Sequence, residues 1–361
     1  MKFIPVAEPD LRGNERKYAL ECIDSSWISS LGKYIPAFED KFSSYCGAAQ
    51  GISVSNGTNA LHLALAALGI GKGDEVVIPD LTFVATANAV AYTGAKPVLV
   101  DSDEKTWNID SSKIAEIITP KTKAVIPVHL YGHPCDMDPI MELAKERNLY
   151  VIEDCAEAHG ASYKGKKVGS IGDVGCFSFY GNKILTTGEG GMCLTSDENL
   201  AERMRFLKDH GMSKRRYFHP EIGFNYRMTN LQAAIGLAQL ERIDEIIAAK
   251  IRNAKLYRDF LKSCEGITLQ PEEPYAKTVY WMHSILLEDK FRCNRDLLMH
   301  ELKSNEIDSR PFFIPMHELP PYEQEGFPVS SDLSRKGINL PSSTLLEEED
   351  IKRVCSVISG K

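Results

Sequence analysis

The chain has 361 residues, of which 43% are hydrophobic and 25% are charged, as in ordinary globular proteins. Its formal net charge of −8 at pH 7 argues against a nucleic-acid-binding surface and against electrostatic attachment to a membrane. The length suggests about two domains, and no run of about 18 apolar residues is present that could span a membrane.

Helices and strands are predicted to alternate through the first half of the chain. The apolar stretches with helical spacing predict helices at residues 59–69, 85–92, 113–118 and 139–147. Short apolar runs predict strands at residues 75–79, 96–100, 124–128 and 149–153. Because these strands are apolar on both faces, the pattern indicates an α/β fold with a mainly parallel sheet covered by helices.

Lys183 lies in the most informative segment of the sequence. A short run rich in aromatic residues at 177–180 predicts a strand, Lys183 follows at its exit, and a glycine-rich turn leads into a second strand at 192–195. A desolvated lysine amine in such a turn suits Schiff-base chemistry, because burial makes it nucleophilic at neutral pH. A surface lysine in a loop is the alternative for this segment taken alone.

The pattern changes after the glycine-rich turn. Helices are expected at residues 199–208 and 230–249, the second long and amphipathic, and a strand at 280–287 within proline-rich loops. We therefore expect a large domain at residues 1–248 and a smaller α+β domain at residues 249–361, joined by the long helix.

The cysteine pattern bears on the compartment. The nine cysteines form no CxxC pairs, and the first residues lack the apolar stretch of a signal peptide, so we expect a protein of the reducing cytoplasm. The histidine and cysteine spacings match none of the usual zinc sites, and no metal is expected.

Three further features lie where predicted strands end and could act together with Lys183. Residues 55–58 begin the first long helix and could bind an anion or serve as a plain N-cap. Asp154 could keep a ring nitrogen protonated or act as a structural ion-paired acid. Phe83 could cover a flat cofactor or pack in the core. Together with Lys183 they form the set that pyridoxal phosphate chemistry requires.

The order of these motifs resembles the sugar aminotransferases that act on nucleotide-linked keto-sugars, the DegT/DnrJ/EryC1/StrS type. The resemblance runs from Gly13 to Pro341 and is most specific at residues 153–160, 181–191 and 223–230. It implies a fold-type I, pyridoxal-5'-phosphate-dependent aminotransferase, with a large mainly parallel sheet and a smaller C-terminal α+β domain. It also implies a homodimer with shared active sites.

The resemblance implies a role for each matching residue. Lys183 would bond to the cofactor and move protons, Asp154 would pair with the ring nitrogen, and Glu157 would lie over the ring. Gly57, Thr58 and Ser178 would bind the phosphate of the cofactor, and Phe83 would line the ring pocket. Asn225 would reach the phosphate from a second subunit.

Residues 27–30, 128–138 and 309–317 imply the branch that aminates GDP-4-keto-6-deoxymannose with glutamate as donor, a step of lipopolysaccharide O-antigen biosynthesis. Arg310 and His317 are the candidate contacts to the nucleotide-sugar, and both could instead be structural. The alternatives are a 3- or 4-aminotransferase of a UDP- or dTDP-keto-sugar, or a non-catalytic aminotransferase-like regulator. A dehydratase branch carries histidine at the position of Lys183, so transamination is favoured.

Overall fold

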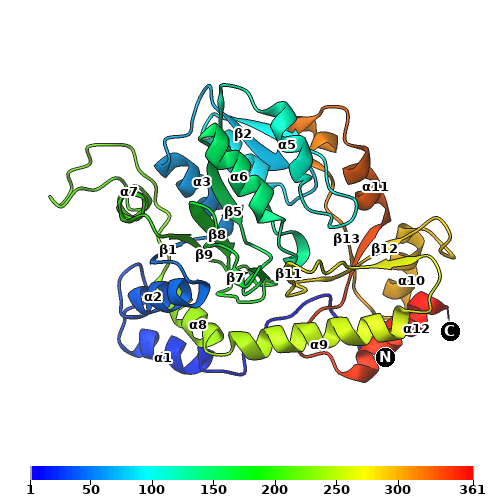
Figure 1. Cartoon of the computed structure of the whole chain (residues 1–361). Coiled ribbons are helices and arrows are strands. Elements are labelled where there is room, and N and C mark those ends of the chain that lie inside the picture. Colours follow the sequence, from blue (N-terminus) through cyan, green and yellow to red (C-terminus); the bar gives the residue numbers. More distant parts are fainter. Residues whose placement is uncertain (1, 361) are drawn as a thin grey trace.

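In the computed structural model, which describes residues 2–360, a seven-stranded sheet forms the centre of the larger part of the molecule (Figure 1). Its strand order is β1-β9-β8-β5-β4-β2-β3. The strands are β1 (Gln50–Val54), β2 (Glu75–Pro79), β3 (Lys96–Val100), β4 (Thr122–Val125), β5 (Tyr150–Asp154), β8 (Val174–Ser178) and β9 (Gly191–Thr195). Strand β9 is antiparallel to both neighbours, and the remaining strands share one direction. The predicted mainly parallel sheet is therefore confirmed.

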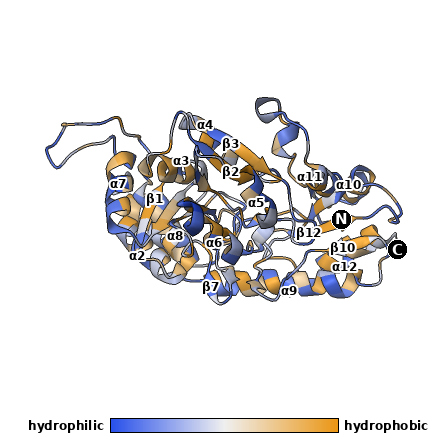
Figure 2. Cartoon of the chain, turned by 45° about the horizontal axis from the view of Figure 1, so that its top comes forward, coloured by the Kyte–Doolittle hydropathy of each residue, from blue (hydrophilic) through white to orange (hydrophobic). Residues whose placement is uncertain are grey.

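Helices cover both faces of this sheet. They are α1 (Glu15–Asp24), α2 (Tyr34–Cys46), α3 (Gly57–Ala67), α4 (Ala85–Tyr92), α5 (Ser111–Ile117), α6 (Met137–Arg147), α7 (Glu198–Lys208) and α8 (Asn230–Leu240). Hydrophobic residues concentrate on the strands and on the helix faces that turn toward them (Figure 2). The short helix η1 (Leu130–Gly132) follows β4.

The smaller part contains a second sheet of order β10-β12-β14-β13 (Figure 1). Its elements are α9 (Ile243–Leu261), β10 (Ile267–Leu269), β12 (His283–Leu287), α10 (Arg295–Ser304), β13 (Arg310–Pro311), η2 (Met316–Glu318), η3 (Pro320–Tyr322), α11 (Pro328–Lys336), β14 (Gly337–Leu340) and α12 (Glu348–Ser359). A third sheet joins β11 (Ala276–Lys277), β6 (Ser162–Tyr163) and β7 (Lys166–Lys167). The expected domain boundary at 248/249 falls inside α9, and the division stays a prediction.

The single long helix predicted at residues 230–249 is wrong. The chain forms α8 and α9 with a corner at Glu241 and Arg242, because tertiary contacts hold it there. Asn14 and Tyr18 of the N-terminal region each donate a 2.7 Å hydrogen bond to the Glu241 carboxylate. The apolar spacing continues through the corner without glycine or proline, so the sequence carried no stop signal.

The strand predicted from residue 280 begins instead at His283. Tyr280 has a φ of 49°, in the left-handed region that a bulky residue rarely adopts, and this turn interrupts an extended strand. Trp281 and Met282 therefore lie outside the ladder, and Trp281 faces the larger part of the molecule.

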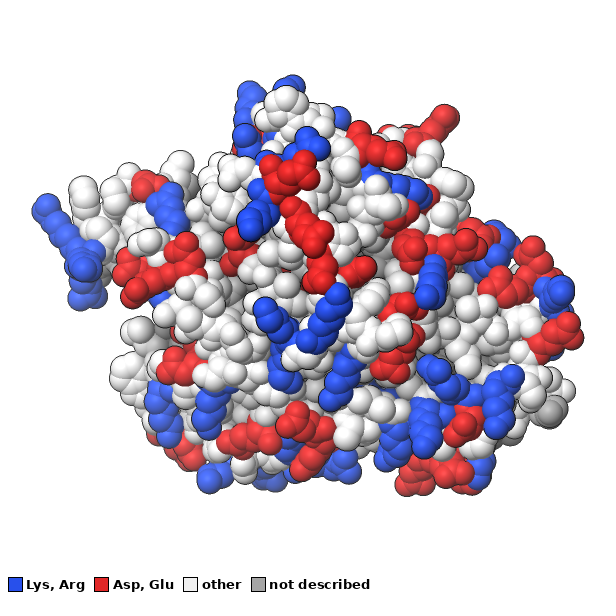
Figure 3. All heavy atoms as spheres, in the orientation of Figure 1, with Lys and Arg blue, Asp and Glu red and all other residues white. Residues whose placement is uncertain are grey.

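The molecular surface mixes charges of both signs on the face seen in Figure 3. Among residues 2–360, none of the helices combines the length and apolar composition that crossing a membrane requires. Between α7 and α8, residues 209–229 extend from the body as an arm (Figure 1). Basic residues lie at the tip of this arm in Figure 3. Tyr217 and Ile222, which also belong to the arm, are 75% and 91% exposed.

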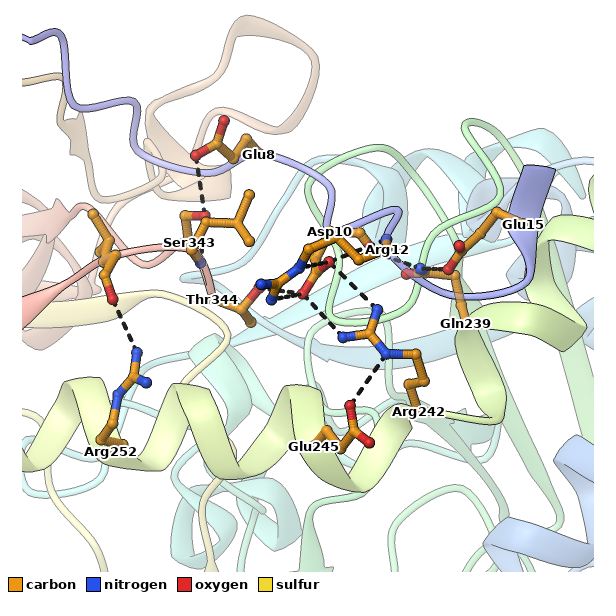
Figure 4. Close-up of polar contacts among 12 residues, drawn as sticks. Glu8, Asp10, Arg12, Glu15, Gln239, Arg242, Glu245, Arg252, Ser343 and Thr344 are labelled. Atoms are coloured by element: carbon orange, nitrogen blue, oxygen red, sulfur yellow. Dashed lines mark hydrogen bonds and ion pairs between the residues drawn. The ribbon is translucent and has the colours of Figure 1, made fainter.

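Residues 4–14 form a strap that runs from the smaller part along α9 (Figure 4). Asp10 is its main anchor: its carboxylate accepts bonds of 2.8 and 2.7 Å from Arg12 and a 3.3 Å bond from Arg242 of the α8–α9 corner. The Arg12 guanidinium holds the pKa of Asp10 well below its usual range, and Arg242 adds to this against the effect of burial.

Asp10→Asn should lower the free energy of unfolding at pH 7 by about 1–3 kcal/mol, because the charged acceptor is lost. Since the pKa of Asp10 is depressed on folding, its contribution is present above the unfolded value of about 3.9 and is lost as the pH falls. Urea unfolding midpoints should therefore differ most at neutral pH and converge in acid. Glu8→Gln, on the same strap and exposed, should change little. A pH-independent difference for Asp10→Asn would contradict this account.

Candidate active site

The candidate residues gather at the edge of the large sheet where the co-directional strands have their carboxyl ends. Asp154 is the last residue of β5, Ser178 is the last residue of β8, and Gly57 begins the helix that follows β1. Open α/β sheets bind ligands at this edge, because the loops there diverge and leave a crevice.

Lys183 lies in the turn after β8, where its backbone N–H donates a 2.9 Å bond to the carbonyl of Tyr180. Its side chain is 12% exposed, and Nζ is 3.8 Å from Oε1 of Glu157 and 3.9 Å from the ring centroid of Trp281. Burial lowers the pKa of this amine, while the charges of Glu157 and Asp154 oppose the shift. The side chain is thus buried, unlike that of a surface-loop lysine.

Asp154 is buried with both carboxylate oxygens engaged. Oδ2 accepts a 2.9 Å bond from the hydroxyl of Thr86, and Oδ1 accepts a 3.1 Å bond from the backbone N–H of Ala156. Burial raises the pKa of Asp154, whereas these two donors and the charge of Lys183 favour the ionised form. The carboxylate is therefore oriented to accept a hydrogen bond from a protonated ring nitrogen.

Glu157 is the second buried acid beside Lys183. Its Oε2 accepts a 2.8 Å bond from the backbone N–H of Tyr131, a residue with a φ of 51°. Burial raises the pKa of Glu157 to about 7, and the charge of Lys183 opposes this rise. The strained turn at Tyr131 thus orients an acid whose charge state changes near neutral pH.

The start of α3 forms a backbone cradle against β8. The side chain of Asn56 caps the helix by accepting a 2.8 Å bond from the N–H of Asn59, which leaves the N–H groups of Gly57 and Thr58 for a ligand. A Cβ at Gly57 would lie 2.6 Å from Cβ of Ser178, so only glycine allows this approach. The helix N-terminus and the Ser178 hydroxyl form a site suited to a phosphate.

The remaining predicted site residues have other neighbours in the structure. The ring of Phe83 is 54% exposed, with its centroid 5.6 Å from that of Phe313. Asn225 lies at the base of the arm, where its side chain accepts bonds from Arg227. Arg310 is exposed and paired with Asp308, and His317 donates from its backbone and ring to Asp80 at the end of β2.

Three functional neighbours were not identified from the sequence: Thr86, Tyr131 and Trp281. Thr86 is the second residue of α4, the helix that follows β2 at the same sheet edge, so its position was a usable signal. Tyr131 acts through its backbone, and Trp281 arrives from a distant segment; neither leaves a local pattern in the sequence.

A cluster of three buried polar side chains lies around Glu153, the neighbour of Asp154 on β5. Donor atoms of His129, Glu153 and Cys155 lie within 4.8 Å of one another. The Glu153 carboxylate, however, already accepts backbone N–H groups from residues 169–172 and lies 3.1 Å from Nε2 of His129. This carboxylate therefore anchors the loop of residues 169–172, and the expectation that no metal is bound stays a prediction.

The residues present fit pyridoxal phosphate. The cradle at Gly57 and Ser178 suits its phosphate, the oriented Asp154 carboxylate suits its ring nitrogen, and the buried amine of Lys183 suits its aldehyde. These groups come from three strand ends of one sheet edge, which is the arrangement that a flat, doubly anchored cofactor requires.

The profile of the DegT/DnrJ/EryC1/StrS aminotransferase family matches residues 9–359. GDP-perosamine synthase of Caulobacter vibrioides is 51% identical over 98% of this chain and 97% of its own length. GDP-perosamine synthase of Escherichia coli O157:H7 is 49% identical over 99% and 98%. Among solved structures, S. venezuelae DesV superposes with a TM-score of 0.93 at 35% identity, covering 100% of this chain and 98% of DesV.

Thr86→Val should weaken the binding of pyridoxal phosphate about five- to thirtyfold, because the ionised form of Asp154 loses a charge-assisted hydrogen bond worth about 1–2 kcal/mol. The dissociation constant can be measured by absorbance titration of the cofactor-free protein. Thr82→Val is the matched control, since Thr82 lies only 3.5 Å from the Thr86 hydroxyl. Equal losses in both variants, or none in Thr86→Val, would contradict the role of this bond.

Proposed function

The chain belongs to the DegT/DnrJ/EryC1/StrS aminotransferase family, and we propose that it converts GDP-4-keto-6-deoxymannose to GDP-perosamine with glutamate as amino donor. It is a pyridoxal-phosphate-dependent nucleotide-sugar aminotransferase. The observation that carries the choice of sugar is the similarity to GDP-perosamine synthases along nearly the whole chain. The product would serve O-antigen synthesis.

Bound pyridoxal phosphate supplies the carrier for the amino group and an electron-withdrawing ring. The amine of Lys183 is the base that takes the proton from the α-carbon of glutamate and returns one to C4 of the sugar. Burial suits it to this work, because the lowered pKa makes the neutral form of the amine easier to reach.

The two acids have different tasks in this proposal. Asp154 keeps the ring nitrogen protonated, and its bonds from Thr86 and Ala156 fix the carboxylate for that contact. Glu157, 3.8 Å from Nζ, balances the charge of Lys183 when the amine carries a proton. Gly57, Thr58 and Ser178 bind the phosphate and thereby fix the cofactor relative to Lys183.

Arg310 and His317 are the proposed contacts to the nucleotide-sugar. The buried carboxylate of Asp80 at the end of β2 anchors His317 by a 2.7 Å bond, at the same sheet edge as Asp154. The Arg310 side chain is 57% exposed, which leaves its guanidinium accessible to a phosphate. The basic arm residues 214–216 could add charge for the diphosphate.

We infer that two chains assemble and share their active sites. The arm supports this inference: Tyr217, Phe218 and Ile222 are exposed on it, and monomeric proteins rarely project such apolar groups into solvent. Asn225 at the base of the arm would then reach the phosphate of the cofactor bound to the partner, and Phe83 would line the ring pocket.

A competition assay tests the substrate. The holoenzyme is incubated with glutamate labelled with nitrogen-15 and with the GDP-, UDP- or dTDP-linked 4-keto-6-deoxy sugar, and products are identified by mass and NMR. We expect label at C4 of the GDP-sugar, at a rate at least about tenfold above the others. Lys183→Ala should lose about a thousandfold or more in turnover.

Each other outcome of that assay assigns a different function. Preferred amination of the UDP- or dTDP-sugar would replace the GDP-sugar proposal by one of the other aminotransferases. Cofactor binding without label transfer to any sugar would favour the non-catalytic regulator.

A mixed-subunit experiment tests the shared site. Lys183→Ala and Asn225→Ala subunits are each nearly inactive in this proposal, but a mixed dimer has one site with both residues intact. Random mixing should therefore restore about a quarter of the wild-type activity. The oligomeric state is checked by analytical ultracentrifugation. Additive residual activities after mixing would show that Asn225 acts within its own chain.

A further inference from the structure

Trp281 contacts Lys183 at two places. The ring centroid lies 3.9 Å from Nζ, and the indole Nε1–H donates a 2.8 Å bond to the carbonyl of Asn182, the residue before the lysine. Trp281 is itself 4% exposed. Its ring is therefore fixed against the turn that carries Lys183 and faces the amine from the C-terminal part of the chain.

The amine has few other partners. Oε1 of Glu157, at 3.8 Å, is too distant for a hydrogen bond. A π face at 3.9 Å lies well within the range of cation–π attraction, which is strongest for tryptophan and for desolvated cations. Trp281 and Glu157 thus both lie where they favour the protonated amine, and neither binds it by a directional hydrogen bond.

A second buried lysine holds Trp281 in place. Nζ of Lys250, on α9, donates bonds of 2.9 Å to the carbonyl of Trp281 and 2.5 Å to the carbonyl of Ser342, the loop after β14. Lys250 is 5% exposed, and burial lowers the pKa of its amine to about 7. Its amino group therefore donates to two backbone segments and fixes the position of Trp281.

The ring of Tyr131 adds a contact from the larger part of the molecule. It is stacked at 15° to the ring of Trp281, with centroids 6.3 Å apart, and the Tyr131 N–H bonds to Glu157. Tyr131 thereby links Trp281 to Glu157, the other neighbour of the amine.

We propose that Trp281 is a positioning residue for Lys183, that its ring stabilises and aligns the protonated amine that exists between the two proton transfers, and that Lys250 secures this ring. The proposal rests on the proposed role of Lys183. Between the two proton transfers the protonated amine must stay in position without a strong hydrogen bond that would have to break. A π face attracts the amine without forming such a bond.

The test measures the titration of Lys183 directly in cofactor-free protein. Brief competitive labelling with acetic anhydride, from about pH 6 to about pH 11, is read by peptide mass spectrometry. Trp281→Leu removes the π face, so the labelling midpoint of Lys183 should fall by about half to one pH unit. Trp281→Phe retains a ring and should shift the midpoint by less than half as much.

Matched lysine variants test the second part. Lys250→Met should move the midpoint of Lys183 in the same direction as Trp281→Leu but less far, because the ring remains with a looser backbone. Lys255→Met removes an exposed lysine from the same helix and should leave the midpoint unchanged. Trp281→Met, which keeps more volume, replaces the leucine variant if that variant does not fold.

An unchanged midpoint in the folded Trp281→Leu or Trp281→Met variant would overturn the inference, as would equal shifts in the leucine and phenylalanine variants. Equal effects of Lys250→Met and Lys255→Met would remove the role of Lys250. Because the readout needs no turnover, these failures are distinguishable from a failure of the proposed aminotransferase reaction.

Discussion

The burial of one amine constrains the rest of this structure. Lys183 Nζ lies in a space closed by Glu157 and Trp281, and removal of the amine from water is what makes its neutral form accessible. An uncompensated buried charge would cost several kcal/mol, so groups that attract the protonated form must surround it. The acid and the indole do so without forming a short hydrogen bond.

These groups come from distant parts of the sequence, and the fold brings them to one edge. The parallel strands deliver Asp154 and Ser178 at their carboxyl ends, and α3 offers its N-terminus beside them. The C-terminal part contributes Trp281, which Lys250 of α9 holds by its carbonyl. The N-terminal strap is bonded to the α8–α9 corner through Asp10 and Arg242 (Figure 4).

The sequence was sufficient for the parts of the fold that local patterns encode. Strands 75–79 and 96–100 and helix 85–92 agree with β2, β3 and α4, since their apolar periods and turn residues are unambiguous. The corner at Glu241 and the turn at Tyr280 were missed, because each is held by tertiary contacts. The same reason explains the site: Lys183 and Asp154 follow strands, whereas Trp281 becomes a neighbour only after folding.

The most direct test of the account is the identity of the lysine that bonds to the cofactor. Burial is the main cause of a lowered pKa for both Lys183 and Lys250. Borohydride reduction of the pyridoxal-phosphate-loaded protein, followed by peptide mass spectrometry, fixes the cofactor to the lysine that holds it. The account predicts a pyridoxyl group on Lys183 and none on Lys250. A label on Lys250, or on neither lysine, would contradict it.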